Sequence, residues 1–143
     1  MSMDKADEQA VVPMIAYQDG PAAMDWLARA FGFVERTRWL TDDGRLSHGE
    51  MLAGAGLVMM ATPDPAYESP RTHRAGCDRA DRWLRTTNIV DGVLVYVGDV
   101  DAHHARAEAA GAVILTPVEE GGPGKRYRAE DIEGHRWMFM QHS

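Results

Sequence analysis

The fold is decided near the C-terminus, by the stretch Tyr127-Arg-Ala-Glu-Asp-Ile-Glu-Gly-His-Arg-Trp-Met-Phe139. Its pattern predicts a strand, a tight turn of the form Asp-x-x-Gly, and a second strand. An earlier stretch, residues 46–60, has the same outline, with a glycine-rich turn between two apolar runs. A hairpin that recurs at the end of each half of the chain predicts one module used twice.

Composition is that of an ordinary globular domain. The 143 residues suffice for one domain with a core, or for two small modules that share one. No apolar run approaches the roughly 20 residues that a membrane helix needs, so we expect no membrane partner. A net charge of −7 argues against nucleic acid as a partner, because phosphate binding needs a basic face. The single cysteine, Cys77, excludes an internal disulfide and favours a cytoplasmic location.

The first module is predicted at residues 11–62, after an N-terminal tail over residues 1–10 that lacks the pattern of a secretion signal. A helix begins at Gly20-Pro21 and ends at Gly32, with apolar residues at helical spacing between them. Asp42-Asp43-Gly44 is a hairpin turn signal. The order β-α-β-β-β follows from strands predicted at residues 11–17, 33–40, 46–52 and 57–61.

The second module is predicted at residues 92–143, in the same order. Asp99 precedes an alanine-rich helix at residues 102–110, which Gly111 ends. The strand after this helix is predicted to be short, because Thr116-Pro117 would end it. The predicted strands are residues 93–97, 113–115, 126–129 and 136–140.

Residues 63–91 lie between the two modules. They hold three prolines and then an Arg/Asp-rich run in which residues 78–85 could form a short helix. We interpret this segment as a linker along an edge of the domain. A lid or an arm that contacts a second copy is the alternative, because a structureless loop of this length is unusual in a compact domain.

The two modules and the closing hairpin resemble the vicinal oxygen chelate superfamily, which includes glyoxalase I, extradiol dioxygenases, fosfomycin-resistance enzymes and bleomycin-binding proteins. The closest resemblance is to an uncharacterised group often called PhnB-like. The closing Asp-x-x-Gly-x-x-Trp is similar to a family pattern in which proline usually stands where this chain has Ile132. The residues that carry the resemblance are Pro13, 26–32, 48–50, 97–102 and 127–139.

The resemblance implies an α+β fold in which each module curls its sheet into a half-barrel and two modules enclose a cleft. It also implies that metal-using members carry His and Glu ligands on the first and last strands of each module. Aligning Gly56 with Gly134 places the last-strand positions at Met60 and Met138. The first-strand positions fall at Val12 or Pro13 and at Gly92 or Val93. None of these is a usual ligand of a divalent cation, so we expect no metal cofactor, while a metal held by other residues stays open.

His48 and Glu50 are the best candidate pair for chemistry. Residues at i and i+2 of a strand share a face, so a carboxylate can orient an imidazole that acts as general base. The same pair could be two ligands of an off-pattern metal site, or a hydrogen-bonded polar pair on the sheet surface. We interpret His103 and His104 as helix-surface residues, and His73 with Cys77 as part of a solvated loop.

Candidate ligand-binding residues follow if Met138 faces the cleft, because the residues on the same face of its strand then face the cleft too. Arg136 shares that face and could bind a carboxylate or phosphate of a ligand. Met60 and Val58 would line the same cleft from the first module. The candidate aromatic walls are Trp39, Tyr96 and Tyr127, and core packing is the alternative for each.

Two functions are compatible with this sequence. The first is metal-free binding of a small molecule, such as a drug or hydrophobic metabolite. The second is a metal-dependent lyase, isomerase or dioxygenase of the same superfamily that uses His48 and Glu50; acid–base catalysis by that pair without a metal is a weaker variant. Under either function we expect a homodimer, because open sheet edges favour two-fold pairing.

Overall fold

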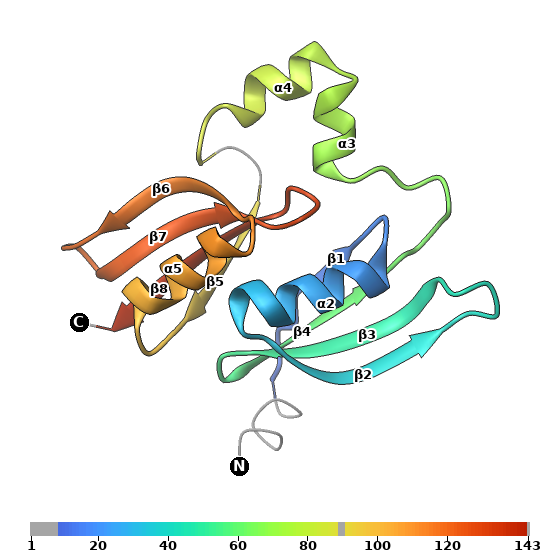
Figure 1. Ribbon diagram of the computed structural model, residues 1–143, viewed down its shortest axis with the longest axis horizontal. Coiled ribbons are helices and arrows are strands. Elements are labelled where there is room, and N and C mark those ends of the chain that lie inside the picture. The colour runs from blue at the N-terminus through green and yellow to red at the C-terminus, as the bar shows by residue number, and fades with distance from the viewer. Residues whose placement is uncertain (1–8, 89–90, 143) are drawn as a thin grey trace. The chain divides into compact units, whose positions relative to one another are not determined.

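The computed structural model describes residues 9–88 and 91–142. The chain forms two compact units, Met1–Tyr67 and Glu68–Ser143 (Figure 1). Each unit contains one four-stranded mixed sheet and a helix of ten or more residues that packs on it. The α+β fold of two repeated modules, with sheets that do not close, agrees with the prediction.

The first unit has the order β-α-β-β-β. Its elements are β1 (Met14–Ala16), α2 (Gly20–Phe31), β2 (Val34–Leu40), β3 (Leu46–Ala53) and β4 (Gly56–Ala61). The strands lie in the order β1-β4-β3-β2, with β1 parallel to β4 and the other pairs antiparallel. This parallel pair arises because α2 carries the chain from one edge of the sheet to the other.

Local chemistry at both ends fixes α2. The side chain of Asp19 accepts a hydrogen bond from the backbone N–H of Ala22, and proline occupies the first turn. Gly32 ends the helix in the left-handed region, at φ 72°, where glycine carries no Cβ penalty. Its apolar face buries Met24 and Leu27 completely against the sheet.

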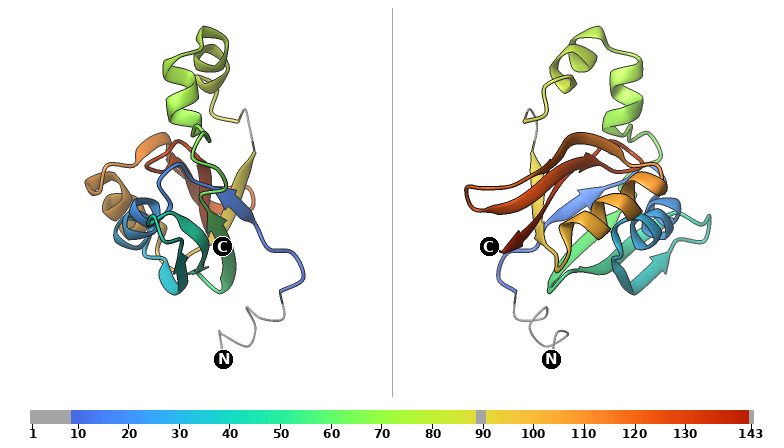
Figure 2. Two further views of the ribbon diagram at one scale, coloured as in Figure 1. Left: turned by 90° about the vertical axis from the view of Figure 1, so that its right-hand side faces the viewer. Right: turned by 60° about the vertical axis from the view of Figure 1, so that its left-hand side comes forward.

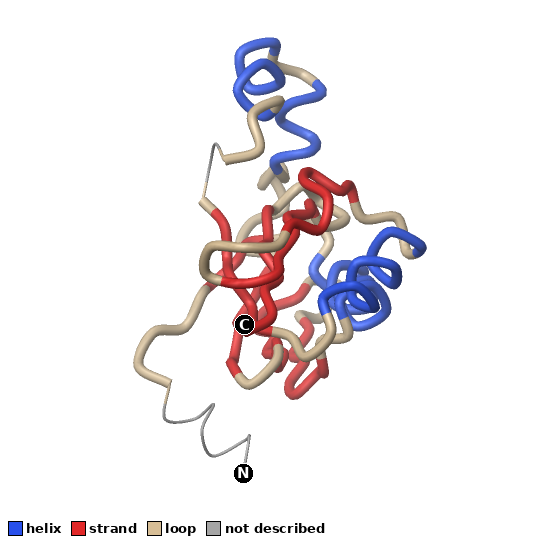
Figure 3. The backbone as a smooth tube through the Cα atoms, turned by 90° about the vertical axis from the view of Figure 1, so that its left-hand side faces the viewer, coloured by secondary structure: helices blue, strands red, loops and turns tan. Residues whose placement is uncertain are grey.

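The second unit repeats this order after two short helices, α3 (Pro70–Ala75) and α4 (Asp78–Leu84). The helix predicted at residues 78–85 is α4, whereas α3 was not predicted. Figures 2 and 3 show the two helices projecting from the strands of their own unit. The repeated elements are β5 (Gly92–Tyr96), α5 (Val100–Ala109), β6 (Val113–Glu119), β7 (Gly124–Glu130) and β8 (Arg136–His142), with the strand order β5-β8-β7-β6.

The prediction that Thr116-Pro117 ends the strand after α5 was wrong. Strand β6 continues through Pro117 to Glu119. It lies at the edge of the sheet, pairs only with β7, and has a register irregularity between Thr116 and Glu119. A proline is tolerated there because its missing N–H faces no partner strand.

The closing motif Asp-x-x-Gly-x-x-Trp is organised by one carboxylate. Asp131 is fully buried, and its Oδ1 accepts from the backbone N–H groups of Glu133 and His135, both at 3.0 Å. Its Oδ2 accepts from the indole Nε1 of Trp137, also at 3.0 Å. Gly134 takes φ 92°, and a Cβ there would lie 2.9 Å from the backbone nitrogen of Arg71. Asp131 therefore holds the backbone of the turn and the Trp137 side chain of β8 at the same time.

The strand pairings of the two modules correspond, but the matching positions of their last strands differ by one residue from the predicted alignment. Glu50 pairs with Met59 in the first sheet, and Arg128 pairs with Met138 in the second. Met59, not Met60, is thus the counterpart of Met138. The predicted alignment failed because it matched the turns, and the turn between β3 and β4 is shorter than the turn between β7 and β8.

Candidate ligand-binding site

Each sheet has one face covered by its helix and one open face. In the second unit, the rings of Tyr127 and Phe139 both contact His103 of α5. Their strand neighbours Arg128 and Met138 point to the opposite side, because successive side chains of a strand alternate. In the first unit, a Cβ on Gly49 would meet Met24 of α2, so its neighbours His48 and Glu50 face away from the helix.

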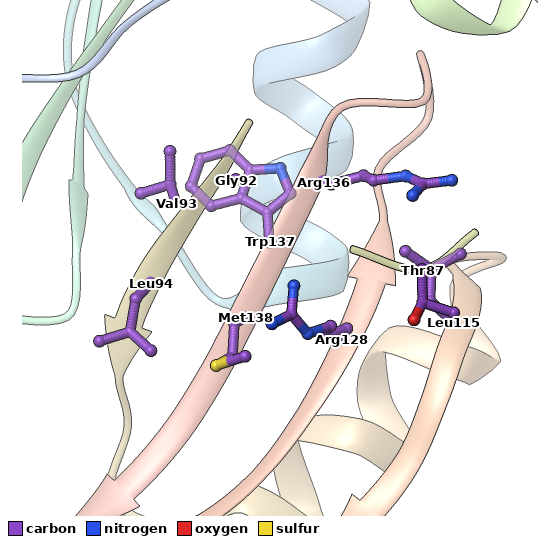
Figure 4. Close-up of a pocket in the computed structure, with 9 residues that line it drawn as sticks. All are labelled: Thr87, Gly92, Val93, Leu94, Leu115, Arg128, Arg136, Trp137 and Met138. Atoms are coloured by element: carbon purple, nitrogen blue, oxygen red, sulfur yellow. The ribbon is translucent and has the colours of Figure 1, made fainter. Parts of the chain in front are cut away.

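The open face of the second sheet contains a hollow of about 200 Å³ (Figure 4). We call it the C-terminal hollow. All four strands of the sheet contribute to it, together with Thr87, which follows the end of α4. Its lining is Thr87, Gly92, Val93, Leu94, Leu115, Arg128, Arg136, Trp137 and Met138.

Arg128 is the polar group that this open face presents to the hollow. Its backbone N–H donates to the Thr116 hydroxyl at 3.0 Å, which fixes its place in the strand. Within residues 9–88 and 91–142, its guanidinium has no hydrogen-bond or ion-pair partner. The prediction did not include Arg128. Strand alternation would have found it, since the buried Tyr127 beside it points to the helix.

Arg136 lines the same hollow, but its guanidinium is bound internally. Nε and Nη2 donate to Oε2 of Glu130 at 3.2 and 3.0 Å, and both side chains are buried. The two Nη atoms also donate to the backbone carbonyls of Leu84 and Thr86. Arg74 adds a second cation, with its Nη1 3.6 Å from Oε2 of Glu130. Arg136 therefore attaches the end of α4 to the sheet.

The open face of the first sheet carries a polar chain. Nε2 of His48 lies 2.7 Å from Oε2 of Glu50, so the prediction that the two side chains meet on one face is confirmed. Oε1 of Glu50 lies 3.2 Å from Nε of Arg36. The Trp39 ring is 5.2 Å from the imidazole and 62% exposed. His48 also borders a second hollow, of about 270 Å³, lined by Met14, Ile15, Ala16, Ser47, His48, Met59, Met60, Ala61 and Pro63.

The remaining predicted residues, Val58, Tyr127 and Tyr96, line neither of the two hollows. Val58 is 3% exposed and belongs to the core. Tyr127 is fully buried, and its hydroxyl lies 2.6 Å from Nδ1 of His103 in α5. Burial raises the pKa of the Tyr127 phenol. Tyr96 is partly exposed and its ring stacks on His142 at 3.9 Å.

The residues at the family's metal positions do not suit a divalent cation. On the open faces, the first and last strands of each module pair Met14 with Met59 and Leu94 with Met138. The first-strand positions therefore lie at Met14 and Leu94, and not at the predicted residues 12–13 and 92–93. These thioether and aliphatic side chains are poor ligands for cations that prefer oxygen or imidazole. Across the described parts of the chain, no three His, Cys, Asp or Glu side chains are grouped to hold a metal ion.

The repeated β-α-β-β-β module with a hollowed open face defines a recognisable class of small α+β protein. A sequence model of the Glyoxalase/Bleomycin resistance protein/Dioxygenase superfamily matches residues 10–139, and the chain belongs to that superfamily. Among its described helices, none is long and apolar enough to cross a membrane.

Three known proteins are similar to this chain. An uncharacterised protein of Mycobacterium bovis is 30% identical over 135 residues, which cover 94% of this chain and 84% of that protein. TioX from Micromonospora sp. ML1 is 30% identical, with a TM-score of 0.68 over 94% of this chain and 97% of TioX. A bleomycin-binding protein from Streptomyces verticillus, solved with copper(II)-bleomycin, is 17% identical, with a TM-score of 0.58 over 94% and 97%.

Proposed function

We propose that this protein binds an apolar small molecule, such as a drug or hydrophobic metabolite, without the help of a metal ion. The observation that carries this proposal is the C-terminal hollow. Leu94, Leu115 and Met138 supply apolar walls there, and Leu94 and Met138 stand where metal-using relatives would need oxygen or nitrogen ligands. Ligand pockets are typically apolar with a few placed polar groups, and methionine adapts to different shapes.

One of the similar proteins gives this proposal independent support. The Streptomyces verticillus structure shares the fold and binds bleomycin. The C-terminal hollow is not fully enclosed, so a ligand larger than its volume can extend beyond the sheet. We propose that Met138 and Arg136 contribute to this site, and that Met59, Trp39 and the second hollow form an apolar surface of the first unit.

Ligand-dependent stabilisation tests the proposal. A broad set of drugs and metabolites is screened by thermal unfolding in the presence of a chelator. A ligand at 100 times its Kd stabilises the folded state by about 2.7 kcal/mol, which a melting curve resolves. For any hit, we expect Leu115→Gln to weaken binding and Val113→Gln, on the same strand but outside the hollow, to leave it unchanged. A screen with no stabilising compound would count against the proposal.

His48 and Glu50 support a second candidate function, which is catalysis. When the Glu50 carboxylate accepts a hydrogen bond from Nε2–H, the lone pair of the imidazole lies on Nδ1. Nδ1 has no partner among the described residues, and His48 borders the hollow beside Met59. This geometry suits a general base with its orienting carboxylate, or two ligands of an off-pattern metal site in a lyase, isomerase or dioxygenase.

Metal content separates the two candidates. Plasma mass spectrometry is done on protein purified without chelators, alongside a His48→Gln variant. A stoichiometric metal that the variant loses would support the enzyme. The same metal content in both proteins would exclude His48 as a ligand, and a metal-free protein would exclude the metal-dependent enzyme.

We also propose that the protein acts as a cytoplasmic homodimer. Strands β1, β2, β5 and β6 lie at the edges of their sheets, and an edge strand can pair with a strand of a second copy. Light scattering tests this directly, because a mass of 15.8 kDa in solution would correspond to a monomer.

A further inference from the structure

We propose that the C-terminal hollow selects ligands that carry an anionic group, and that Arg128 binds that group. The ligand class is an apolar ring or chain that ends in a carboxylate, phosphonate or sulfonate. This inference rests on the proposed function, since it names the chemical class of molecule that the same hollow would hold. Its basis is a difference between the two repeated modules.

The two modules share a bulge at the same place in their sheets. In the first unit, Glu35 pairs with Met51 and Thr37 pairs with Glu50, so Arg36 is an extra residue. In the second unit, Ile114 pairs with Ala129 and Thr116 pairs with Arg128, so the extra residue is Leu115. A bulge redirects the extra side chain, and here both bulged side chains stand beside a charged residue of the neighbouring strand.

The charged residue is neutralised in the first unit. Glu50 is the counterpart of Arg128, and the bulge residue Arg36 lies within 3.2 Å of its carboxylate. His48 binds the other oxygen of Glu50. The negative charge of Glu50 is therefore neutralised within the first module, by the arginine at the bulge.

In the second unit, the charge of Arg128 is not neutralised by a described residue. The bulge residue there is Leu115, which cannot pair with a guanidinium. Met138, the cross-strand partner of Arg128, offers no oxygen either. Arg136 is the other cation of the hollow, and it is already paired with Glu130. Among the described residues that line the hollow there is no carboxylate, although the whole chain has a net charge of −7.

Arg128 is well placed to hold an anion against an apolar floor. Figure 4 shows its guanidinium turned toward Met138, while the Arg136 side chain extends the other way. Both neighbouring strands and the Thr116 hydroxyl fix the backbone of Arg128, so binding has to order only its side chain. A planar guanidinium donates two parallel hydrogen bonds to one carboxylate or phosphonate, which a lysine cannot do.

A matched pair of probes tests this inference. 2-Naphthoate and 2-naphthamide share one ring system and differ in charge. Binding is followed by NMR, where the methyl signals of Leu94, Leu115 and Met138 report occupancy of the hollow. We expect the wild type to bind naphthoate about tenfold more tightly than the amide, because hydrogen bonds between charged groups are the stronger ones. Arg128→Met should remove this preference while leaving the affinity for naphthamide within about twofold.

Two further variants isolate the role of the guanidinium. Arg79→Met makes the same charge change on an exposed position of α4, and it should keep the preference for naphthoate. Arg128→Lys keeps the charge but loses the paired donors, and it should retain only part of the preference. Melting curves of all variants establish that they are folded.

The outcomes distinguish this inference from the proposed function. Equal binding of both probes by the wild type would overturn the anion inference and leave small-molecule binding intact. Absence of binding by either probe at these methyl groups, together with a screen that finds no ligand, would overturn both. A change in oligomeric mass with Arg128→Met, measured on the same samples, would mean that an acidic side chain of a second copy occupies the hollow, which also overturns the inference.

Discussion

Removal of Arg136 should destabilise the second unit strongly. Its side chain is 4% exposed and that of Glu130 is 6% exposed, so neither charge is solvated by water. In Arg136→Met the Glu130 carboxylate would keep only Arg74, at 3.6 Å, as a counter-ion. The carbonyls of Leu84 and Thr86 would also lose their donor.

The expected cost follows from the uncompensated charge. Breaking one partner of a buried ion pair typically costs about 3–5 kcal/mol, because the remaining charge stays buried. We expect the lower end of this range, since Arg74 can move toward Glu130. In the double variant Arg136→Met/Glu130→Leu no unpaired charge remains, so it should be more stable than Arg136→Met by about 1 kcal/mol or more.

Urea unfolding measures these differences. With a slope of about 2 kcal/mol per molar urea, a loss of 3 kcal/mol would lower the midpoint by about 1.5 M. Arg85→Met is the matched control, because Arg85 pairs with Asp81 at the surface and is 73% exposed, and its midpoint should stay within error of the wild type. A double variant less stable than Arg136→Met, or a loss under about 1 kcal/mol in that single variant, would refute the reasoning.

Two other variants test the packing beneath the helices. Burial raises the pKa of Tyr127 above its unfolded value of about 10, so its contribution to stability is complete below pH 10 and is lost at higher pH, as the unfolded chain releases the proton first. In Tyr127→Phe the melting temperature should therefore fall less steeply above pH 10 than in the wild type. The same pH profile in both proteins would show that the pKa of Tyr127 is not raised by burial. A Cβ at Gly49 would lie 2.8 Å from Sδ of Met24, so Gly49→Ala should cost about 1–3 kcal/mol in urea unfolding. Gly98→Ala, which meets nothing within 4 Å, is its control, and equal midpoints for the two variants would contradict the packing.

The sequence contained enough local information to predict most of the fold. Helix α2 is delimited by Asp19 and Gly32, and both signals act through backbone geometry within a few residues. Helix α3 was missed although Ser69 and Pro70 are a good N-terminal signal, and Ser69 accepts from the backbone of Thr72. Pro117 misled the prediction because its effect depends on whether the strand lies at an edge, which is a tertiary property.

The candidate site was harder to predict, because it depends on register. A shift of one residue moves every side chain of a strand to the other face. Matching the two turns placed Met60 where Met59 belongs. Because Tyr127 was predicted to face the cleft, its neighbour Arg128 was assigned to the other face and was not considered. His48 and Glu50 needed only spacing within one strand, so their meeting could be predicted from the sequence.

The repeat itself explains why the two open faces differ in chemistry. A bulge at the same position of both modules presents an extra side chain beside a charged strand residue. Arginine at the bulge neutralises Glu50, and the first face becomes a closed polar chain that positions an imidazole. Leucine at the bulge leaves Arg128 available above Met138 and makes an apolar wall at the same time. The bulge residue and the charged strand residue beside it thus decide together whether the module satisfies its own charge or leaves that charge to a ligand.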